Sequence, residues 1–389
     1  MSSAESRPTD LSGAIQAALQ RGDRQGALAL VLEAERAAPG DKALKMQRAM
    51  VCRLAGDLTG ALAALDEALS LDPYDYVARL SKGALIEKVS GERAAAPAYR
   101  NALALAPPDA EMPPPLRAPT ERARQVLARA TEALEAHLLS RTGAVKAEMS
   151  EAARRRFDEA VGVYAGRAKV YVQEPLLLHY PRLPAIPFYD RGFFPWFAEL
   201  EAATDMIRGE LEGVLQVARD DFAPYIAYPK DAPVNQWGEL NHSKLWSSFF
   251  LWKDGVRQAQ ACELCPKTAA LLEGLPMSDQ PGFAPTAMFS ALEAHTRIPP
   301  HTGSTNVRLI CHLPLILPGP AGFRVGGETR EWKMGEAWVF DDTIEHEAWN
   351  DADELRVILI FDVWNPYLDV GEREYVKALL TARSEFFAG

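Results

Sequence analysis

A periodicity of about 34 residues dominates the first third of this 389-residue sequence. Glycines and prolines recur with it, at Gly22, Gly56 and Gly91 and at Pro39, Pro73 and Pro107. Apolar residues between them have helical spacing. Because proline cannot continue a helix, each proline is expected to close one unit of two helices joined by a turn. One such unit cannot bury its apolar face alone, so three of them must stack to form a continuous core.

The unit length and its closing proline resemble the tetratricopeptide repeat. Small residues stand where two helices must approach closely, at Ala27, Ala61 and Ala96. We therefore expect tetratricopeptide-like repeats over residues 8–110. Their concave surface either binds a protein partner or braces the domain that follows, and the sequence leaves both roles open.

Two changes of composition suggest the remaining organisation. A Pro-rich segment interrupts the repeats at residues 106–120, and residues 120–168 are predicted to form a helical connector or cap. Beyond residue 170 the repetition ends and short β-like segments alternate with Gly/Pro turns, which favours a jelly roll or sandwich over residues 170–389. The predicted fold class is α+β and multidomain.

Charge and hydropathy exclude several classes of protein. The formal net charge of −11 comes without a Lys/Arg-rich block, so nucleic acid is a poor partner. No apolar run approaches the roughly 20 residues that a transmembrane helix needs. The first residues lack the pattern of a signal peptide, so a cytoplasmic location is expected. Cys262 and Cys265 form a C-x-x-C, which we interpret as two ordinary thiols rather than a redox pair or half a zinc site.

Basic side chains stand on otherwise apolar strand faces near the C-terminus. With period-two alternation, Arg308, Ile310 and His312 share one face of a predicted strand. Arg356 lies likewise on one face of the last strand, with Ile358, Ile360 and Asp362. A lone Arg on such a face must find an anion or reach solvent, and its planar fork suits a carboxylate.

Two histidines in turn-to-strand contexts, His301 and His346, suggest a metal site on this β-scaffold. Non-haem Fe(II) oxygenases normally add a carboxylate in an H-x-D/E pattern, but Gly303 occupies that position. On spacing alone, satisfied structural histidines compete evenly with metal ligands.

Long motifs then indicate a family. The segments PHTGSTNVRLICHLPL and FDDTIEHEAWNDADELRVILIFDVWNP resemble the aspartyl/asparaginyl β-hydroxylases, over roughly residues 175–370. The resemblance implies a double-stranded β-helix (jelly-roll, cupin-like) and a dioxygenase that uses Fe(II), 2-oxoglutarate and O2 and releases succinate and CO2. Glycine at the position of Gly303 is a trait of this family, whose iron is held by two His without a protein carboxylate.

The resemblance also implies roles for single residues. His301 and His346 would hold the iron, and Arg356 with Ser290 would bind the distal carboxylate of 2-oxoglutarate. His312 would contact the co-substrate's other carboxylate, and Arg308 the substrate. From the residues alone, Arg308 could instead pair with a nearby carboxylate. Trp246 and Ser247 lie in the segment that lines the co-substrate pocket in the family. Asp341 and Asp342 are expected to orient His346 or to shape the turn before it.

The implied substrate is the β-carbon of an aspartyl or asparaginyl residue in a peptide or protein. Ile310 stands where relatives acting on such residues tend to have a second Arg, which weakens this expectation. The alternatives are the same chemistry on a small molecule or a lipid acyl chain, and a non-catalytic repeat-bearing scaffold.

Overall fold

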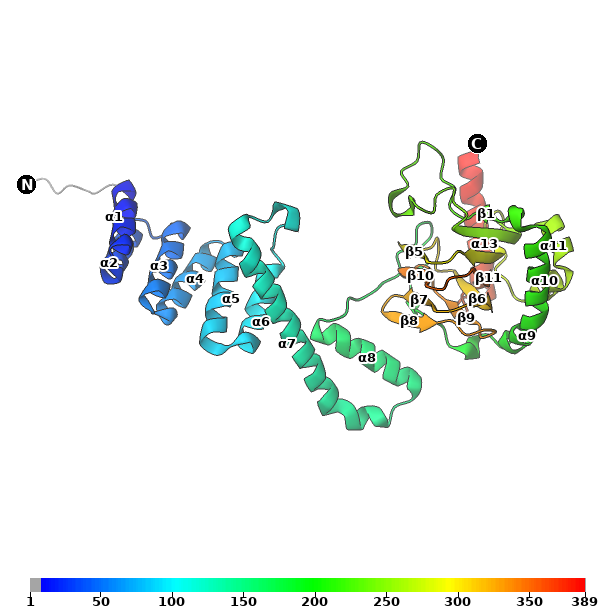
Figure 1. Ribbon diagram of the computed structural model, residues 1–389, viewed down its shortest axis with the longest axis horizontal. Coiled ribbons are helices and arrows are strands. Elements are labelled where there is room, and N and C mark those ends of the chain that lie inside the picture. The colour runs from blue at the N-terminus through cyan, green and yellow to red at the C-terminus, as the bar shows by residue number, and fades with distance from the viewer. Residues whose placement is uncertain (1–7, 389) are drawn as a thin grey trace, which may run out of the picture. The chain divides into compact units, whose positions relative to one another are not determined.

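The computed structural model describes residues 8–388, and the chain divides into two compact units, Met1–Ala168 and Lys169–Gly389. The first unit is helical and the second contains all the strands (Figure 1). Among the described residues, no helix combines the length and the apolar character that crossing a membrane requires. The N-terminal residues on which the expectation of no signal peptide rests lie mostly outside the described part.

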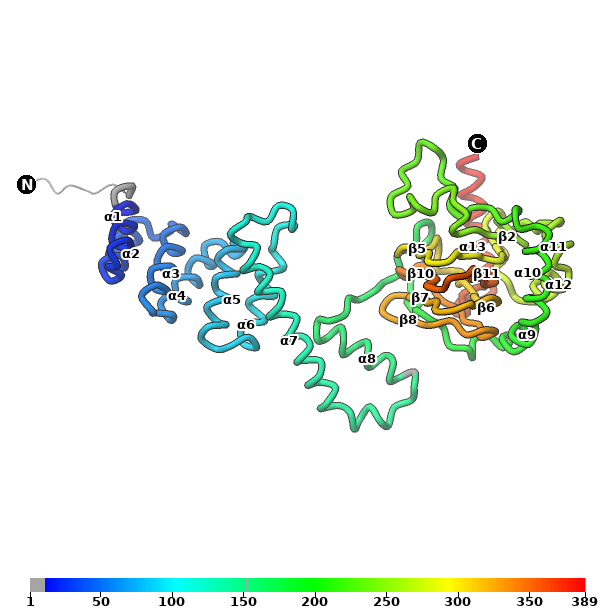
Figure 2. Tube along the Cα trace, viewed as in Figure 1, coloured from blue at the N-terminus to red at the C-terminus, as the bar shows by residue number. Residues whose placement is uncertain are grey.

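Consecutive helices of the first unit pack in series (Figure 2). They are α1 (Pro8–Gln20), α2 (Arg24–Ala37), α3 (Lys42–Ala55), α4 (Leu58–Leu71), α5 (Tyr76–Ser90), α6 (Glu92–Leu103), α7 (Pro114–Ala147) and α8 (Glu151–Ala165). A short 3₁₀ turn, η1 (Asp109–Glu111), precedes α7. The arrangement confirms the predicted tetratricopeptide-like helical pairs.

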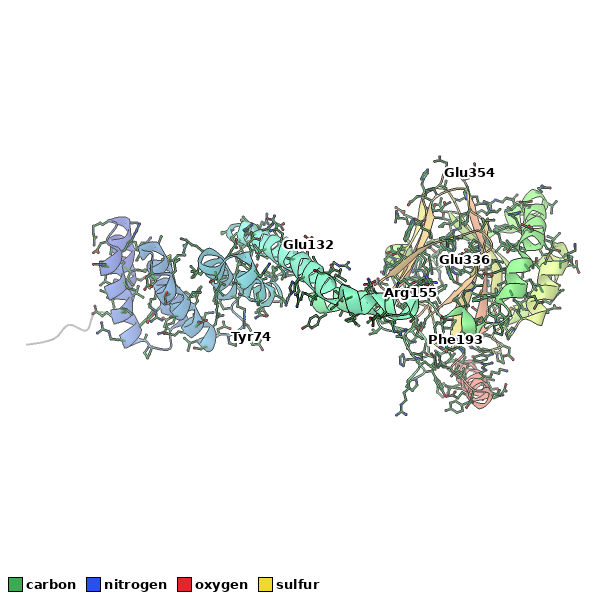
Figure 3. The ribbon with its side chains drawn as sticks, turned by 90° about the horizontal axis from the view of Figure 1, so that it is seen from below. Tyr74, Glu132, Arg155, Phe193, Glu336 and Glu354 are labelled. Atoms are coloured by element: carbon green, nitrogen blue, oxygen red, sulfur yellow. The ribbon has the colours of Figure 1, made fainter. Side chains whose placement is uncertain are left out.

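The periodic glycines lie at the turn inside each pair. Gly22, Gly56 and Gly91 have φ values of +78°, +85° and +82°, a region that favours glycine because it has no Cβ. Aspartates cap the N-termini of α2, α3, α4 and α5: the Asp57 side chain, for example, accepts a hydrogen bond from the Gly60 backbone N–H at 2.8 Å. The turns between pairs face solvent, as Tyr74 does (Figure 3).

The Pro-rich segment interrupts the helices over fewer residues than the sequence predicts, because its second half belongs to a helix. Helix α7 begins at Pro114 and runs for 34 residues, with Glu132 along its length (Figure 3). Pro114 and Pro115 are tolerated because the first N–H groups of a helix have no intrahelical acceptor, whereas Pro119 lies inside the helix. Helix α7 packs against α6 and α8, so residues 114–165 form a further pair stacked on the repeats. The predicted division of this region at residue 120 stays a prediction.

The second unit contains two antiparallel sheets. The larger has the order β1-β2-β4-β11-β6-β9, with β3 beside β2, and the smaller has the order β5-β10-β7-β8. The strands are β1 (Ala223–Pro224), β2 (Trp246–Lys253), β3 (Val256–Arg257), β4 (Ala287–Leu292), β5 (Thr296–His301), β6 (Arg308–Ile316), β7 (Ala321–Val325), β8 (Glu328–Glu331), β9 (Trp338–Phe340), β10 (His346–Asn350) and β11 (Arg356–Trp364). From β4 to β11 the chain winds back and forth between the sheets, which is the predicted double-stranded β-helix.

Helices cover the outer face of the larger sheet (Figure 1). They are α9 (Phe197–Ala202), α10 (Thr204–Val217), α11 (Ala259–Leu264) and α12 (Pro266–Gly274), while α13 (Val370–Ala388) follows the last strand and the short turns are η2 (Arg191–Phe193), η3 (Arg219–Asp221) and η4 (Asn235–Trp237). Leu211 and Leu272 of these helices belong to the same buried core as Leu309 and Leu359 of the sheet. The opposite face of the sheet, which carries Ile310, turns toward the smaller sheet. Strand alternation thus separates a helix-packed core from a space between the sheets.

Candidate active site

A cavity of about 370 Å³ lies between the two sheets. Side chains from β4, β5, β6, β10 and β11 line it, together with residues from the segment that precedes β2. The inward faces that alternation predicted are the ones that line it, with Arg308, Ile310 and His312 on β6 and Arg356 on β11. The cavity therefore gathers the basic residues of two strands with the histidines of two others.

His301 and His346 face each other across neighbouring strands. They are register partners of β5 and β10, and the centroids of their rings are 4.0 Å apart. Each ring is held by its Nδ1, which is 2.8 Å from the Pro299 carbonyl in His301 and 3.0 Å from the Ile344 carbonyl in His346. A backbone carbonyl at Nδ1 fixes the tautomer that leaves the Nε2 lone pair free to bind a metal.

Burial keeps both imidazoles neutral. It lowers the pKa of His301, and it lowers the pKa of His346 well below its ordinary value, with the neighbouring His301 adding to the effect. A metal ligand must be unprotonated, so neither ring has to lose a proton at neutral pH before it binds an ion.

The backbone at Gly303 has no room for a side chain. A Cβ there would lie 1.9 Å from Oδ2 of Asp342, and the Gly303 N–H donates to the Asp342 carbonyl at 2.6 Å. The carboxylate of an H-x-D/E pattern is thus excluded sterically. Over residues 8–388, no group of three or more His, Cys, Asp and Glu side chains is arranged to hold a metal. A metal in this cavity would have two protein ligands and open positions for other groups.

Arg356 is the group that most needs a ligand. It is 1% exposed, and among the described residues nothing accepts a hydrogen bond from its Nε or Nη1. Burial lowers the pKa of Arg356 to about 9, and its guanidinium lies 4.5 Å from the ring centroid of Trp332. An uncompensated buried charge costs several kcal/mol, so this position fits an anion such as a carboxylate.

Other predicted co-substrate residues surround this arginine. Ser290 is the register partner of Ile358 on β11, and its hydroxyl accepts a hydrogen bond from Nε1 of Trp246 at 3.1 Å. That bond leaves the hydroxyl hydrogen of Ser290 free for a ligand. Burial, and secondarily Arg356, keeps the pKa of His312 well below its ordinary value, and His312 Nδ1 has no partner in the described part of the chain.

Ser247 is the one predicted site residue that lies outside the cavity. Alternation along β2 turns Trp246 inward and Ser247 to the face of Phe249, which packs in the core beneath the sheet. The expectation for Ser247 came from its segment as a whole, without regard to which strand face each residue occupies.

Arg308 is compensated within the protein. It forms an ion pair with Asp362, which is 1% exposed and also accepts a hydrogen bond from the Thr286 N–H at 2.7 Å. Burial alone would lower the pKa of Arg308, but Asp362 and Asp342 nevertheless hold it above its ordinary value. The guanidinium also lies over the ring of Phe283. The anion predicted for Arg308 is thus supplied at least in part by Asp362.

Neither of the two aspartates before His346 contacts its second nitrogen, which the Ile344 carbonyl occupies. Asp341 shapes the turn, because it accepts hydrogen bonds from the Thr343 N–H and hydroxyl and from Gln173. Asp342 lines the cavity, and burial raises its pKa to about 7.

Sequence reasoning missed several cavity residues. Asp254, Tyr225 and Trp237 reach the cavity from irregular segments, and Trp332 reaches Arg356 from the loop after β8. Only Asp362 left a signal, since it shares the inward face of β11 with Arg356.

Comparison with known families assigns residues 201–366 to the family described as aspartyl/asparaginyl β-hydroxylase. An ornithine lipid ester-linked acyl 2-hydroxylase of Rhizobium tropici is 37% identical over 196 residues, which are 50% of this chain and 66% of that protein. The aspartyl/asparaginyl β-hydroxylase of Mus musculus is 35% identical over 193 residues, which are 48% of this chain and 25% of that protein. The chain thus spans less than two thirds of either relative.

Solved structures match each unit at low similarity. A tetratricopeptide domain of Spaghetti (RPAP3) aligns with 31% of this chain and 89% of its own at 18% identity, with a TM-score of 0.27. The cupin domain of Schizosaccharomyces pombe Cnp3 aligns with 32% of this chain and 67% of its own at 10% identity, with a TM-score of 0.22. The fold of each unit is therefore assigned from the helices and strands described above, and not from these matches.

Proposed function

Because residues 201–366 belong to the aspartyl/asparaginyl β-hydroxylase family, we propose that this chain is an Fe(II)- and 2-oxoglutarate-dependent dioxygenase that hydroxylates an unactivated C–H bond. One observation carries the proposal: the buried guanidinium of Arg356, which finds no partner within residues 8–388, lines the same cavity as two imidazoles that are held at Nδ1 and turn their Nε2 atoms to a ligand. The combination suits an anionic organic co-substrate bound beside a metal ion.

His301 and His346 would hold the iron through their Nε2 atoms. Arg356 would grip the distal carboxylate of 2-oxoglutarate with its unpartnered N–H groups, and the Ser290 hydroxyl would donate to the same carboxylate. His312, from the adjacent strand, would contact the carboxylate nearer the metal. When bound, Fe(II) activates O2 and couples oxidation of the C–H bond to decarboxylation of 2-oxoglutarate, which yields succinate and CO2.

The protein's contribution is orientation and exclusion of water. The walls of the co-substrate half are buried aromatic and aliphatic side chains, among them Phe323, Phe340 and Ile358. Such walls strengthen the charge pairing of Arg356 with a carboxylate and shield reactive species from side reactions.

The family name favours an aspartyl or asparaginyl β-carbon in a peptide or protein as the target. The Rhizobium tropici relative carries the name of a lipid acyl hydroxylase, so an acyl chain or another small molecule is the second candidate. Ile310 favours the second candidate, because it adds an apolar side chain to the cavity where a basic one would serve an acidic target. The helical repeats would then offer a surface for a protein partner or brace the catalytic domain.

The test is production of succinate from 2-oxoglutarate by the purified full chain with Fe(II) and O2. We expect turnover that depends on iron, and loss of both metal binding and turnover in His346→Ala. His295→Ala is the matched control, since His295 is exposed and pairs only with Asp353 at the surface. A wild-type chain that neither turns over nor binds 2-oxoglutarate would leave the non-catalytic scaffold as the better account.

A further inference from the structure

The charges that line the cavity are unevenly divided along its length. The inward face of β11 carries Arg356 at one end and Asp362 at the other, six residues apart, a span of about 20 Å. Between them β11 presents Ile358 and Ile360, and the neighbouring strands add Met288 beside the polar side chains of Ser290 and His312. The co-substrate end therefore carries the free cation, and the opposite end carries the carboxylates.

Three carboxylates and a single guanidinium line that opposite end. The cavity-lining carboxylates are those of Asp254, Asp342 and Asp362, and the guanidinium is that of Arg308. Asp362 forms an ion pair with Arg308. Among the described residues, Arg308 and Arg356 are the two Arg or Lys residues that line the cavity, and Arg356 lies at the far end from Asp254 and Asp342. Carboxyl groups thus outnumber cations at this end of the cavity.

Of these three carboxyl groups, that of Asp342 is buried yet has an oxygen that lacks a hydrogen-bond donor in the described part of the chain. Its side chain is 6% exposed, and its Oδ1 has no hydrogen-bond partner within residues 8–388. A buried carboxylate oxygen that has given up water without gaining a donor is costly. Asp254 differs, because it is solvent-exposed on the turn after β2 and lines the cavity there. Asp254 and Asp342 together are suited to bind one cationic group, with Asp254 on the solvent side and Asp342 inside the cavity.

We propose that the substrate carries a protonated amine on an apolar stem, and that Asp342, with Asp254, receives the ammonium group. This inference rests on the proposed hydroxylase function and names the substrate class of the same cavity. The apolar stem would pack against the side chains of Ile310, Ile360, Met288 and Phe283. An acidic substrate group would instead meet three carboxylates and a guanidinium that Asp362 already neutralises.

Matched six-carbon probes test the charge preference directly. Hexylammonium, hexanoate and hexanol are titrated against the full chain loaded with Mn(II) and saturated with 2-oxoglutarate, so that Arg356 is blocked as a second carboxylate site. We expect hexylammonium to bind at least 10-fold more tightly than hexanoate and more tightly than hexanol. Asp342→Asn should remove most of that advantage, and Asp254→Asn a smaller part of it.

Ile310→Arg is the opposing variant, because it adds a cation to the same wall and should shift the preference toward hexanoate. Asp353→Asn removes a surface carboxylate outside the cavity and should change nothing. Hexanoate binding that equals or exceeds that of hexylammonium, or no hexylammonium binding, overturns the inference if 2-oxoglutarate still binds. An unchanged preference in both Asp342→Asn and Asp254→Asn overturns it as well. Failure to bind 2-oxoglutarate would instead count against the proposed function.

Discussion

Two arginines project into the cavity from neighbouring strands, Arg356 from β11 and Arg308 from β6, and their surroundings differ. Arg308 has a carboxylate partner in Asp362, although its Nε also lacks a hydrogen-bond partner among the residues described. Arg356 has unpartnered N–H groups among the residues described, and burial lowers its pKa to about 9. Each also lies over an aromatic ring, Trp332 for Arg356 and Phe283 for Arg308.

This difference separates a binding group from a structural one. Both arginines look alike in sequence, as single cations on an apolar strand face. The protein stabilises the charge of Arg308 itself, so a ligand gains little by pairing with it. It leaves Arg356 uncompensated, so an anionic ligand recovers the desolvation cost already incurred in folding. An unsatisfied buried cation therefore indicates a ligand more strongly than a cation that merely lines a cavity.

The largest expected effect concerns stability without ligands. Arg308→Met should lower the free energy of unfolding of the C-terminal unit by about 3–5 kcal/mol, because it leaves Asp362 buried without its cation. Arg356→Met should not lower it and should raise it by up to a few kcal/mol, because the substitution removes a buried charge that has no ion-pair partner among the residues described. Urea unfolding followed by tryptophan fluorescence measures this unit alone, because all eight tryptophans lie between residues 196 and 364.

The double variant Arg308→Met/Asp362→Leu serves as the control. Removing both charges should restore most of the lost stability, because buried ion pairs are often replaceable by apolar side chains. Equal destabilisation by Arg308→Met and Arg356→Met would break the comparison.

The second-largest effect concerns 2-oxoglutarate binding, where substitution of Arg356 should cost more affinity than substitution of Arg308. Arg356→Met should weaken 2-oxoglutarate binding by on the order of 100-fold, because a charge-assisted pair of hydrogen bonds is worth roughly 1.5–3 kcal/mol or more. Arg308→Met should weaken it by less than about threefold. Arg356→Lys keeps the charge but loses the planar fork and should fall between wild type and Arg356→Met. Calorimetric titration with Mn(II) present measures all three, and a larger loss in Arg308→Met would contradict the assignment.

Alternation along the strands was sufficient to predict which face each residue occupies. It placed Arg308, His312 and Arg356 toward the cavity, as the structure has them. It could not reveal the pairing of Arg308 with Asp362, which lies 54 residues away, because the register of β6 and β11 is set by the tertiary fold. The repeat period likewise predicted the helical pairs, whereas the start of α7 at Pro114 depends on a helix end that tolerates proline.

Residues outside the strands were beyond this reasoning. Trp332 lies in the loop after β8, where no periodicity relates it to Arg356. The sequence relates Asp342 to His346 by nearness alone, whereas its contact with position 303 depends on two loops meeting in space. The family resemblance implies a role for the whole segment around Ser247, but the alternation of β2 turns this side chain away from the cavity.

The smallest expected effect concerns the rings beneath the two guanidiniums. Trp332 covers one face of Arg356, with 4.5 Å between the guanidinium carbon and the ring centroid, and so leaves the N–H edges free for a carboxylate. A cation–π contact of this kind is worth about 0.5–2 kcal/mol. Trp332→Leu should therefore weaken 2-oxoglutarate binding by about 2- to 30-fold, and Trp332→Phe, which keeps a ring, by less. Phe283→Leu removes the ring beside Arg308 and should leave that affinity unchanged. If the two Leu variants lowered affinity equally, the rings would act through general packing of the cavity, and Trp332 would have no positioning role toward Arg356.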